Sequence, residues 1–411
     1  MPRMGRGFGW LWAAYAVSSF GTFLAFDAFT LVAVLVLHAG PAEVSVLAAV
    51  GRAAGAVAAV PLGPWVEFRR KRPVMVATDL VRFVAVGSVP VAFALGWLGL
   101  GQLVVVSVVV AAADIAFRAA SGAYLKGLLR DDELLLANGR FESTTWTTTA
   151  LGPPLGGLLT GLLGPVVTVG ANAVSYLLSA AGIKASGAKA GGEESRPVRS
   201  GARLRVGDVL EGWRTILRHP TLRPLFVNTV LVNGLIMATA PPVALLMLGP
   251  LGFTPWEYGL AFGLPCVGGL VGARLARPLV ARFGAGRVLR VAGTLRACWS
   301  LGLVFVGPGT GGLVLVLVVQ FGLVTCMGAF NPVLATHRLQ HTATDRVART
   351  LAAWSVTGNA SIALLTASWG VLAGVFGLRA AVAAAGVLLL ATPFLLPRNA
   401  STPAPSLAGT P

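Results

Sequence analysis

The 411-residue sequence is short of charge. Only 11% of its residues are charged, and 15 residues are acidic. Soluble globular proteins carry roughly 25% charged residues, so this deficit argues against a soluble fold. Cysteine and histidine are scarce too, with three and four residues, and they form no cluster with the spacing of metal ligands. We therefore predict no metal site.

Two nucleotide-binding patterns are also missing. The sequence contains no GxxxxGK[ST] loop and no GxGxxG in a strand-to-helix context, which argues against an ATP-driven pump. A polytopic membrane enzyme would need clustered carboxylates or metal ligands at a membrane edge. The only acidic run is Asp131-Asp132-Glu133, which we interpret as helix capping. An enzyme therefore stays a remote alternative, and we expect none.

Long apolar runs are what the chain does contain. Hydrophobic residues make up 55% of it, and a membrane-spanning helix needs ~20 mostly apolar residues. The pattern predicts an all-α integral membrane protein with twelve transmembrane helices. The predicted spans are 10–37, 44–66, 74–96, 101–125, 141–163, 165–183, 224–248, 256–276, 287–306, 312–336, 350–376 and 378–396.

The basic residues predict the orientation of these spans. With the N-terminus in the cytoplasm, 27 of the 32 Lys and Arg fall in internal segments, and external loops hold only Arg379. We therefore expect both termini in the cytoplasm of a bacterium, with the chain in the inner (plasma) membrane. The net charge of +17 then indicates contact with anionic membrane lipids, and not with nucleic acid.

The polar segments divide the chain into four parts. We expect a six-helix half at 1–183, a cytoplasmic linker at 184–223, a second six-helix half at 224–397 and a disordered cytoplasmic tail at 398–411. Within the linker, apolar residues from Val206 to Leu217 recur at helical spacing. They predict an amphipathic helix that lies on the inner membrane surface. Two six-helix halves are a transporter architecture whose substrate site lies near the midplane.

Three motifs carry a family resemblance, and the first lies between the second and third spans. Gly63, Glu67 and the basic run Arg69, Arg70, Lys71, Arg72 resemble the loop signature of the major facilitator superfamily, with Phe68 in place of a basic residue. The resemblance implies a cytoplasmic gate lock in which the acid and the arginines bind helix ends. We interpret Asp79 and Arg82 in the next span as scaffolding for this gate.

The other two motifs point to exporters. Gly152, Pro153, Gly156 and Gly157 resemble the superfamily's antiporter motif, which implies a hinge that faces the other half. The order Asp345, Arg346, Arg349 is similar to branches that include drug, macrolide and enterobactin exporters. The resemblance implies a monomer that needs no cofactor and draws its energy from the proton gradient.

Charged residues inside the spans are candidates for proton coupling, because each one is costly in a bilayer. Asp27 and Arg52 lie at similar depths in the first two spans and could meet. Asp114 and Arg118 share one helix face at spacing i,i+4. Each pair is either a proton-coupling site or a fixed structural ion pair, and both alternatives stay open.

Polar residues of the second half are candidates for the substrate cavity. Asn228 and Asn233 lie in the seventh span, and Gln320 and Asn331 lie in the tenth. Arg296 in the ninth span has no acid nearby in the spans of that half. It could reach toward the membrane surface, meet backbone carbonyls or bind an anionic substrate.

Together these observations predict a secondary active transporter that works by alternating access. The leading hypothesis is a proton-driven exporter, or antiporter, of a small amphiphilic molecule such as a drug or secondary metabolite. The alternative is a uniporter or proton symporter that imports a small nutrient.

Overall fold

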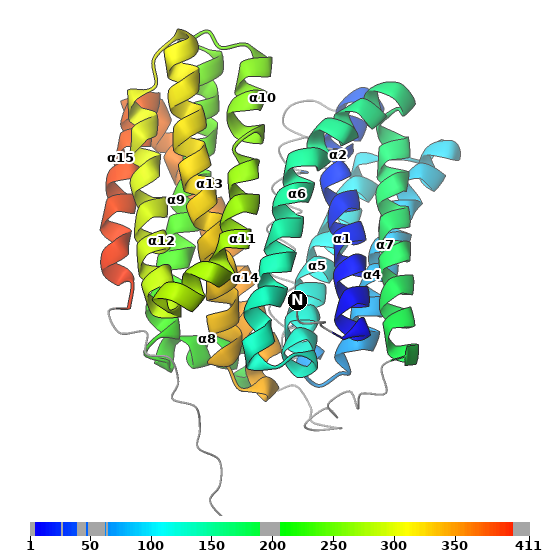
Figure 1. The fold of residues 1–411 in the computed structure, drawn as a ribbon. Helices are drawn as coiled ribbons and strands as arrows, with labels where there is room; N and C mark the ends of the chain where they lie inside the picture. The colour runs from blue at the N-terminus through cyan, green and yellow to red at the C-terminus, as the bar shows by residue number, and fades with distance from the viewer. Residues whose placement is uncertain are drawn as a thin grey trace, which may run out of the picture.

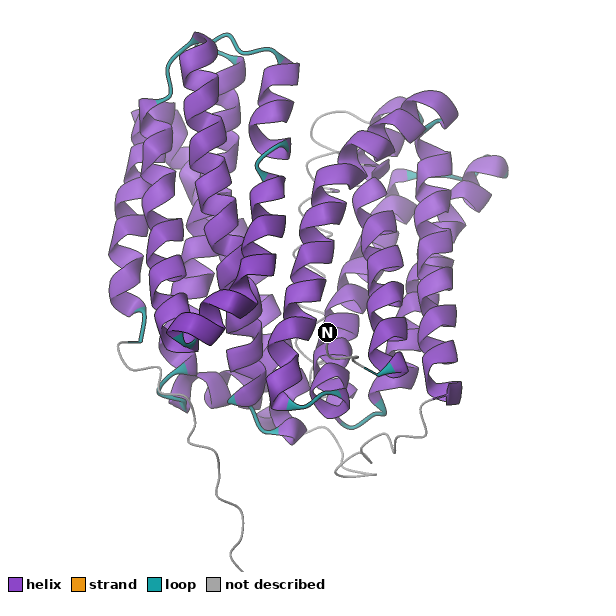
Figure 2. Cartoon of the chain, viewed as in Figure 1, coloured by secondary structure: helices purple, strands orange, loops and turns teal. Residues whose placement is uncertain are grey.

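A computed structural model describes residues 5–25, 28–38, 65–189 and 206–397, together with Leu47 and Leu62. Every long regular element within these ranges is an α-helix, and they contain no strand (Figure 2). The all-helical class predicted from the sequence is therefore confirmed for the described part of the chain.

The first half of the chain and the linker hold seven described helices. They are α1 (Arg6–Leu24), α2 (Ala28–Leu35), α4 (Lys71–Ala94), α5 (Leu100–Leu128), α6 (Asp131–Leu163), α7 (Pro165–Lys189) and the linker helix α8 (Val206–Arg218).

The second half continues with α-helices and short 3₁₀ turns. They are α9 (Leu222–Leu248), α10 (Pro255–Gly263), α11 (Cys266–Phe283), α12 (Ala285–Trp299), η1 (Ser300–Phe305), α13 (Gly309–Gln340), η2 (Thr344–Arg346), α14 (Val347–Phe376), α15 (Leu378–Ala391) and η3 (Thr392–Leu395).

Single glycines make the tightest connections between these helices. Gly164 and Gly377 each join two helices as the only residue between them, with φ of 85° and 90°. Such positive φ values are strained for residues with a Cβ atom, so glycine is the suitable residue there. One-residue turns force α6 against α7 and α14 against α15 as neighbours.

Most helices agree with the predicted spans to within several residues, and α6 begins ten residues earlier than predicted. Nine helices of the described chain are long and apolar enough to cross a membrane. The predicted span 10–37 is divided into α1 and α2, and 256–276 into α10 and α11. Most of the predicted span 44–66 lies outside the described residues, so the count of twelve stays a prediction.

The helices form two bundles that lie side by side (Figure 1). In one, α1 packs on α6 and α7, and α4 packs on α5 and α7. In the other, α13 packs on α11 and α12, and α9 packs on α14 and α15. Between the bundles, α6 meets α11 and α13, and α5 meets α14.

The two bundles are held together at one end. We call it the linker end, because α7 finishes there and α8 and the start of α9 lie there (Figure 1). The hydrogen bonds between described residues of the two bundles involve the last turn of α5, the first half of α6, the second half of α13 and Thr342 just after it. At the opposite end the bundles stand apart in Figure 1.

The linker helix α8 is helical as predicted, and one side of it packs on α14. Leu210 and Leu217 remain exposed, so its place on the membrane surface stays a prediction. A Cβ atom at Gly212 would come within 2.4 Å of the Arg349 carbonyl oxygen, and Trp213 Nε1 donates to Thr357 Oγ1 at 2.9 Å. Ile216 is fully buried. The glycine allows this close approach, which sequence periodicity alone does not reveal.

The antiporter motif serves helix packing within the first bundle. A Cβ atom at Gly156 would lie 1.9 Å from the Leu24 carbonyl oxygen, and one at Gly152 would lie 2.5 Å from Phe23 Cβ. A Cβ atom at Gly157 meets nothing within 4 Å. Two of the motif's glycines therefore hold α6 against the end of α1, and the third lies in open space.

This difference generates a prediction about stability. Gly156→Ala should destabilise the protein by ~1–3 kcal/mol through overpacking and lower its thermal unfolding midpoint in detergent. Gly157→Ala is the matched control and should not lower the midpoint, since alanine favours a helix by ~1 kcal/mol over glycine. Equal midpoints for the two variants would contradict this account.

Candidate functional site

A cavity of about 450 Å³ lies between the two bundles. Its walls come from α1, α5 and α6 on one side and from α9, α13 and α14 on the other. The polar and charged side chains on these walls include Tyr15, Arg118, Asn138, Glu142, Thr145, Asn233, Asn331 and Arg338. A site built from both bundles changes shape when they move relative to each other.

The predicted Asp114–Arg118 pair is present at this cavity. Arg118 Nε lies 2.7 Å from Asp114 Oδ2 within α5, and Asp114 Oδ1 lies 3.4 Å from Arg82 Nη1 of α4. Arg82 also pairs with Asp79, which accepts a hydrogen bond from Ser179 at 2.7 Å. Asp79 and Arg82 thus stabilise the interior of the first bundle and do not reach the opposite one.

Glu142 is a cavity residue that the sequence analysis missed. It lies eleven residues after the start of α6 at Asp131, about 16 Å along the helix. The predicted span began at residue 141, which placed Glu142 at a membrane edge. The acidic run 131–133, which we interpreted as helix capping, would have revealed the true start of this helix. Glu133 Oε2 accepts a hydrogen bond from the Arg130 backbone N–H, which is the contact expected at a helix N-terminus.

Glu142 is held by groups from both bundles. Its Oε1 accepts hydrogen bonds from Trp146 Nε1 at 2.9 Å and from Asn331 Nδ2 of α13 at 2.8 Å. The Trp146 ring lies against Gly269 of α11, where a Cβ atom would come within 2.2 Å of it. Among the described residues Glu142 forms no ion pair. The cavity therefore holds a carboxylate whose hydrogen bonding depends on the closeness of the bundles.

The predicted cavity residues of the second half divide into two groups. Asn233 and Asn331 line the cavity as expected. Asn228 and Arg296 do not, because both side chains are fully buried and Arg296 Nη2 donates to Asn228 Oδ1 at 2.7 Å. The Arg296 guanidinium also lies 3.7 Å from the centre of the Phe330 ring. Gln320 is buried in α13 away from the cavity walls.

Three predicted residues cannot be placed. Asp27, Arg52 and Gly63 lie outside the residues that the structure describes. The pairing of Asp27 with Arg52 therefore stays a prediction.

The gate motif forms an ion cluster at the linker end, which we call the lock. Arg349 lies in the first turn of α14, and its Nε is 2.5 Å from Glu67 Oε2. The Nη1 of the same arginine pairs with Glu211 of α8. Glu211 also lies 3.4 Å from Arg346 Nε. Both Glu67 and Arg349 are buried, so the lock joins the first bundle, the linker helix and the second bundle in one place.

The remaining residues of the gate motif make different contacts. The Phe68 ring lies 5.1 Å from the Arg349 guanidinium, so this departure from the superfamily pattern contributes a cation–π contact. Arg72 Nε donates to the Ile183 carbonyl at 3.0 Å and ties α4 to α7 within the first bundle. Arg69 and Arg70 are exposed.

A second polar contact reinforces closure at the linker end. Lys126 Nζ, in the last turn of α5, donates to the carbonyl oxygens of Leu339, at 2.5 Å, and Thr342. The carbonyls of a helix's last turn lack intrahelical partners and attract cations. Lys126, which belongs to the first bundle, thereby provides a hydrogen-bond donor for a carbonyl at the end of α13 in the second bundle.

Comparison with known proteins identifies the family. A family model described as Major Facilitator Superfamily matches residues 11–338. The chain belongs to the major facilitator superfamily. The resemblance seen in the motifs is thereby confirmed, and the protein is a multi-pass membrane transporter.

Relatives of this superfamily member differ in cargo. The multidrug efflux pump Tap of Mycolicibacterium fortuitum is 26% identical over 315 residues, covering 74% of this chain and 75% of Tap. A bacterial homologue of the iron transporter ferroportin in an outward-facing state is 17% identical with a TM-score of 0.79, covering 95% of this chain and 99% of that one. The human organic anion transporter MFSD10 (TETRAN) is 13% identical with a TM-score of 0.76, covering 97% and 100%. At such identities the likeness to these two structures shows the fold alone.

The lock predicts a pH dependence of closure in this transporter. Burial raises the pKa of Glu67 from 4.5 to about 8, although Arg349 and Lys71 oppose the shift. We expect Glu67 to meet water when the linker end opens, so that its pKa returns toward the ordinary value of 4.5. The closed form therefore binds more protons, and this contribution favours closure at low pH, where the carboxyl is neutral. It is lost as the pH rises through about 8 and the carboxylate that pairs with Arg349 forms.

We expect the ratio of closed to open molecules to fall by about tenfold or more between pH ~6 and ~9. Distances between spin labels at Arg70 and Ala343, after replacement of the three native cysteines, would measure this ratio. Glu67→Gln should remove the pH dependence of the closed-to-open ratio. The control Asp132→Asn changes an exposed acid at the linker end and should retain that pH dependence. An unchanged pH dependence in Glu67→Gln would contradict the assignment.

Proposed function

We propose that this transporter exports a small amphiphilic molecule, such as a drug or a secondary metabolite, in exchange for protons. It works as a monomer in the bacterial plasma membrane, with twelve spans in two halves that are divided at residues 183 and 224. Both termini, the linker 184–223 and the tail 398–411 lie in the cytoplasm. Proton coupling through Asp27 with Arg52, or through Asp114 with Arg118, belongs to this proposal.

The observation that carries the proposal is the cavity between the bundles. It is lined mainly by uncharged polar and apolar groups and contains the carboxylate of Glu142, a chemistry that suits an amphiphile. The Arg349–Glu67 ion pair and the hydrogen bond from Lys126 to Leu339 join the bundles at the linker end, so substrate in the cavity is separated from that side. With the linker in the cytoplasm, this arrangement belongs to the release step of export.

Two similarities favour export over import. The Tap relative is named as an efflux pump, and Gly152, Pro153, Gly156 and Gly157 resemble the superfamily's antiporter motif. Import by uniport or proton symport would use the same cavity, so the direction of net transport is the property to measure.

The direct test is accumulation of fluorescent amphiphiles and antibiotics in an efflux-deficient bacterial host. Cells that produce the wild-type chain should accumulate less dye than cells with an empty vector, and a protonophore should abolish the difference. Export that persists after collapse of the proton gradient would contradict proton coupling. Higher accumulation in producing cells would instead support the import alternative.

A second prediction concerns the charge of Glu142. In Glu142→Gln the amide oxygen still accepts from Trp146 and Asn331, so the fold should be retained while the negative charge is lost. We expect transport to fall by about tenfold or more, since a positioned proton-transfer group typically contributes ~10²–10⁴-fold to a rate.

The matched control is Glu257→Gln, which changes an acid in the capping box of α10 outside the cavity. Both variants should reach the membrane in wild-type amounts on immunoblots. Wild-type transport rates in Glu142→Gln would show that the cavity works without this charge.

A further inference from the structure

A second and larger hollow lies on the other side of α6 from the cavity. It has a volume of about 1230 Å³ and is bounded by α1, α6 and α7 of the first bundle and by α11 of the second. We call it the lateral groove. Gly139, Arg140, Ser143 and Thr147 of α6 face it, whereas Asn138, Glu142 and Thr145 face the cavity. Its walls therefore also come from both bundles.

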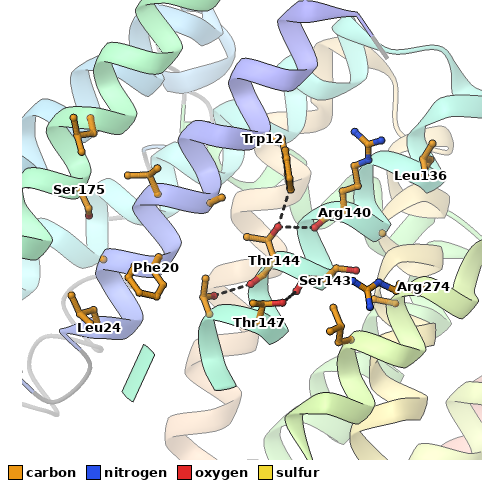
Figure 3. Close-up of a pocket in the computed structure, with 18 of the residues that line it drawn as sticks. Trp12, Phe20, Leu24, Leu136, Arg140, Ser143, Thr144, Thr147, Ser175 and Arg274 are labelled. Carbon is orange, nitrogen blue, oxygen red and sulfur yellow. Dashed lines mark hydrogen bonds between the residues drawn. The ribbon is translucent and has the colours of Figure 1, made fainter. Parts of the chain in front are cut away.

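Three arginines line the groove toward the linker end. Helices α6 and α11 approach each other at Gly139, where a Cβ atom would lie 3.4 Å from the Ala273 carbonyl oxygen. Arg140 and Arg274 are the next residues on the two helices, so they belong to the same level of the groove. Arg277 lies one turn further along α11. Arg140 and Arg274 lie apart from Phe20 and Leu24 at the far side of the groove (Figure 3). Within the described ranges none of the three forms an ion pair.

Beyond the arginines the groove becomes apolar. Val17, Phe20 and Leu24 of α1 and Val174 and Leu178 of α7 line it. From Trp12 to Leu24 the groove follows α1 for twelve residues, or ~18 Å. One leaflet of a bilayer's hydrocarbon core is about 15 Å deep. The whole groove therefore spans about the depth of one leaflet, and its apolar part, from Val17 to Leu24, covers ~11 Å of that depth.

Uncharged polar groups lie between the arginines and the apolar part of the groove. Trp12 Nε1 donates to Thr144 Oγ1 at 2.9 Å, and Thr144 donates to the Arg140 carbonyl (Figure 3). Thr147 and Ser143 lie beside them on the groove wall. Tryptophan and hydroxyl groups at this level match the glycerol and ester region between a lipid headgroup and its chains.

We propose that the lateral groove binds one anionic phospholipid from the leaflet at the linker end. The phosphate lies at Arg140, Arg274 and Arg277, since guanidinium groups bind phosphate through paired N–H donors. One acyl chain follows Phe20 toward Leu24. Because α11 belongs to the second bundle, the bound lipid bridges both bundles and stabilises the arrangement in which the linker end is closed. This site is separate from the cavity and independent of the direction of transport.

The test is lipid retention by the purified full chain in detergent. The protein is incubated with equal amounts of phosphatidylglycerol and phosphatidylcholine, and bound lipid is counted by native mass spectrometry. Wild-type protein should retain phosphatidylglycerol over phosphatidylcholine by about tenfold. The double variant Arg274→Gln, Arg277→Gln should lose most of that preference.

The matched control removes the same charge from a nearby surface, at Arg282 in the last turn of α11 and Arg287 in the first turn of α12. Arg282 and Arg287 are exposed and do not line the groove, so Arg282→Gln, Arg287→Gln should keep the wild-type preference. An equal loss in both double variants would overturn the proposal, because it would indicate general attraction to a basic surface. Equal retention of the two lipids by wild-type protein would overturn it as well.

Discussion

The cost of a polar group in apolar surroundings governs much of this structure. An ionised side chain at the middle of a bilayer costs about 2.5–3.5 kcal/mol on insertion scales, so it needs a partner from a neighbouring helix. Arg82 meets this need by joining Asp79 to Asp114 across α4 and α5. Arg296 meets it with Asn228 and the face of Phe330. These contacts lie inside single bundles and fix how their helices are rotated.

Contacts between the bundles have a different character. The ion pairs and most of the hydrogen bonds between them lie toward the linker end, as in the pairing of Arg349 with Glu67 and the capping of α13 by Lys126. They stand beside apolar packing of α6 on α11 and of α5 on α14. A small set of ion pairs and hydrogen bonds can exchange partners for water when the bundles separate, whereas a large apolar core resists separation. Closure at one end can therefore be reversed while each bundle keeps its own packing.

Helix α6 connects the three functional regions. Gly152 and Gly156 bring it against α1, Glu142 on one face enters the cavity, and Arg140 on another face lines the lateral groove. Trp146 extends from α6 to Gly269 of α11. A shift of α6 relative to α11 would alter the hydrogen bonding of Glu142 and the width of the groove at the same time, since both depend on that one helix contact.

The sequence by itself determined the local features. Runs of apolar residues predict the approximate position of most described helices, although α6 begins ten residues before its predicted span. The spacing of Asp114 and Arg118 predicts their pairing, because it depends on the geometry of one helix. The motifs also identified the superfamily. Only the tertiary structure decided that Glu142 faces a cavity, that Arg296 is buried with Asn228, and that α8 packs on α14. These contacts join segments far apart in the chain, and helical periodicity does not determine which distant helix a given face will meet.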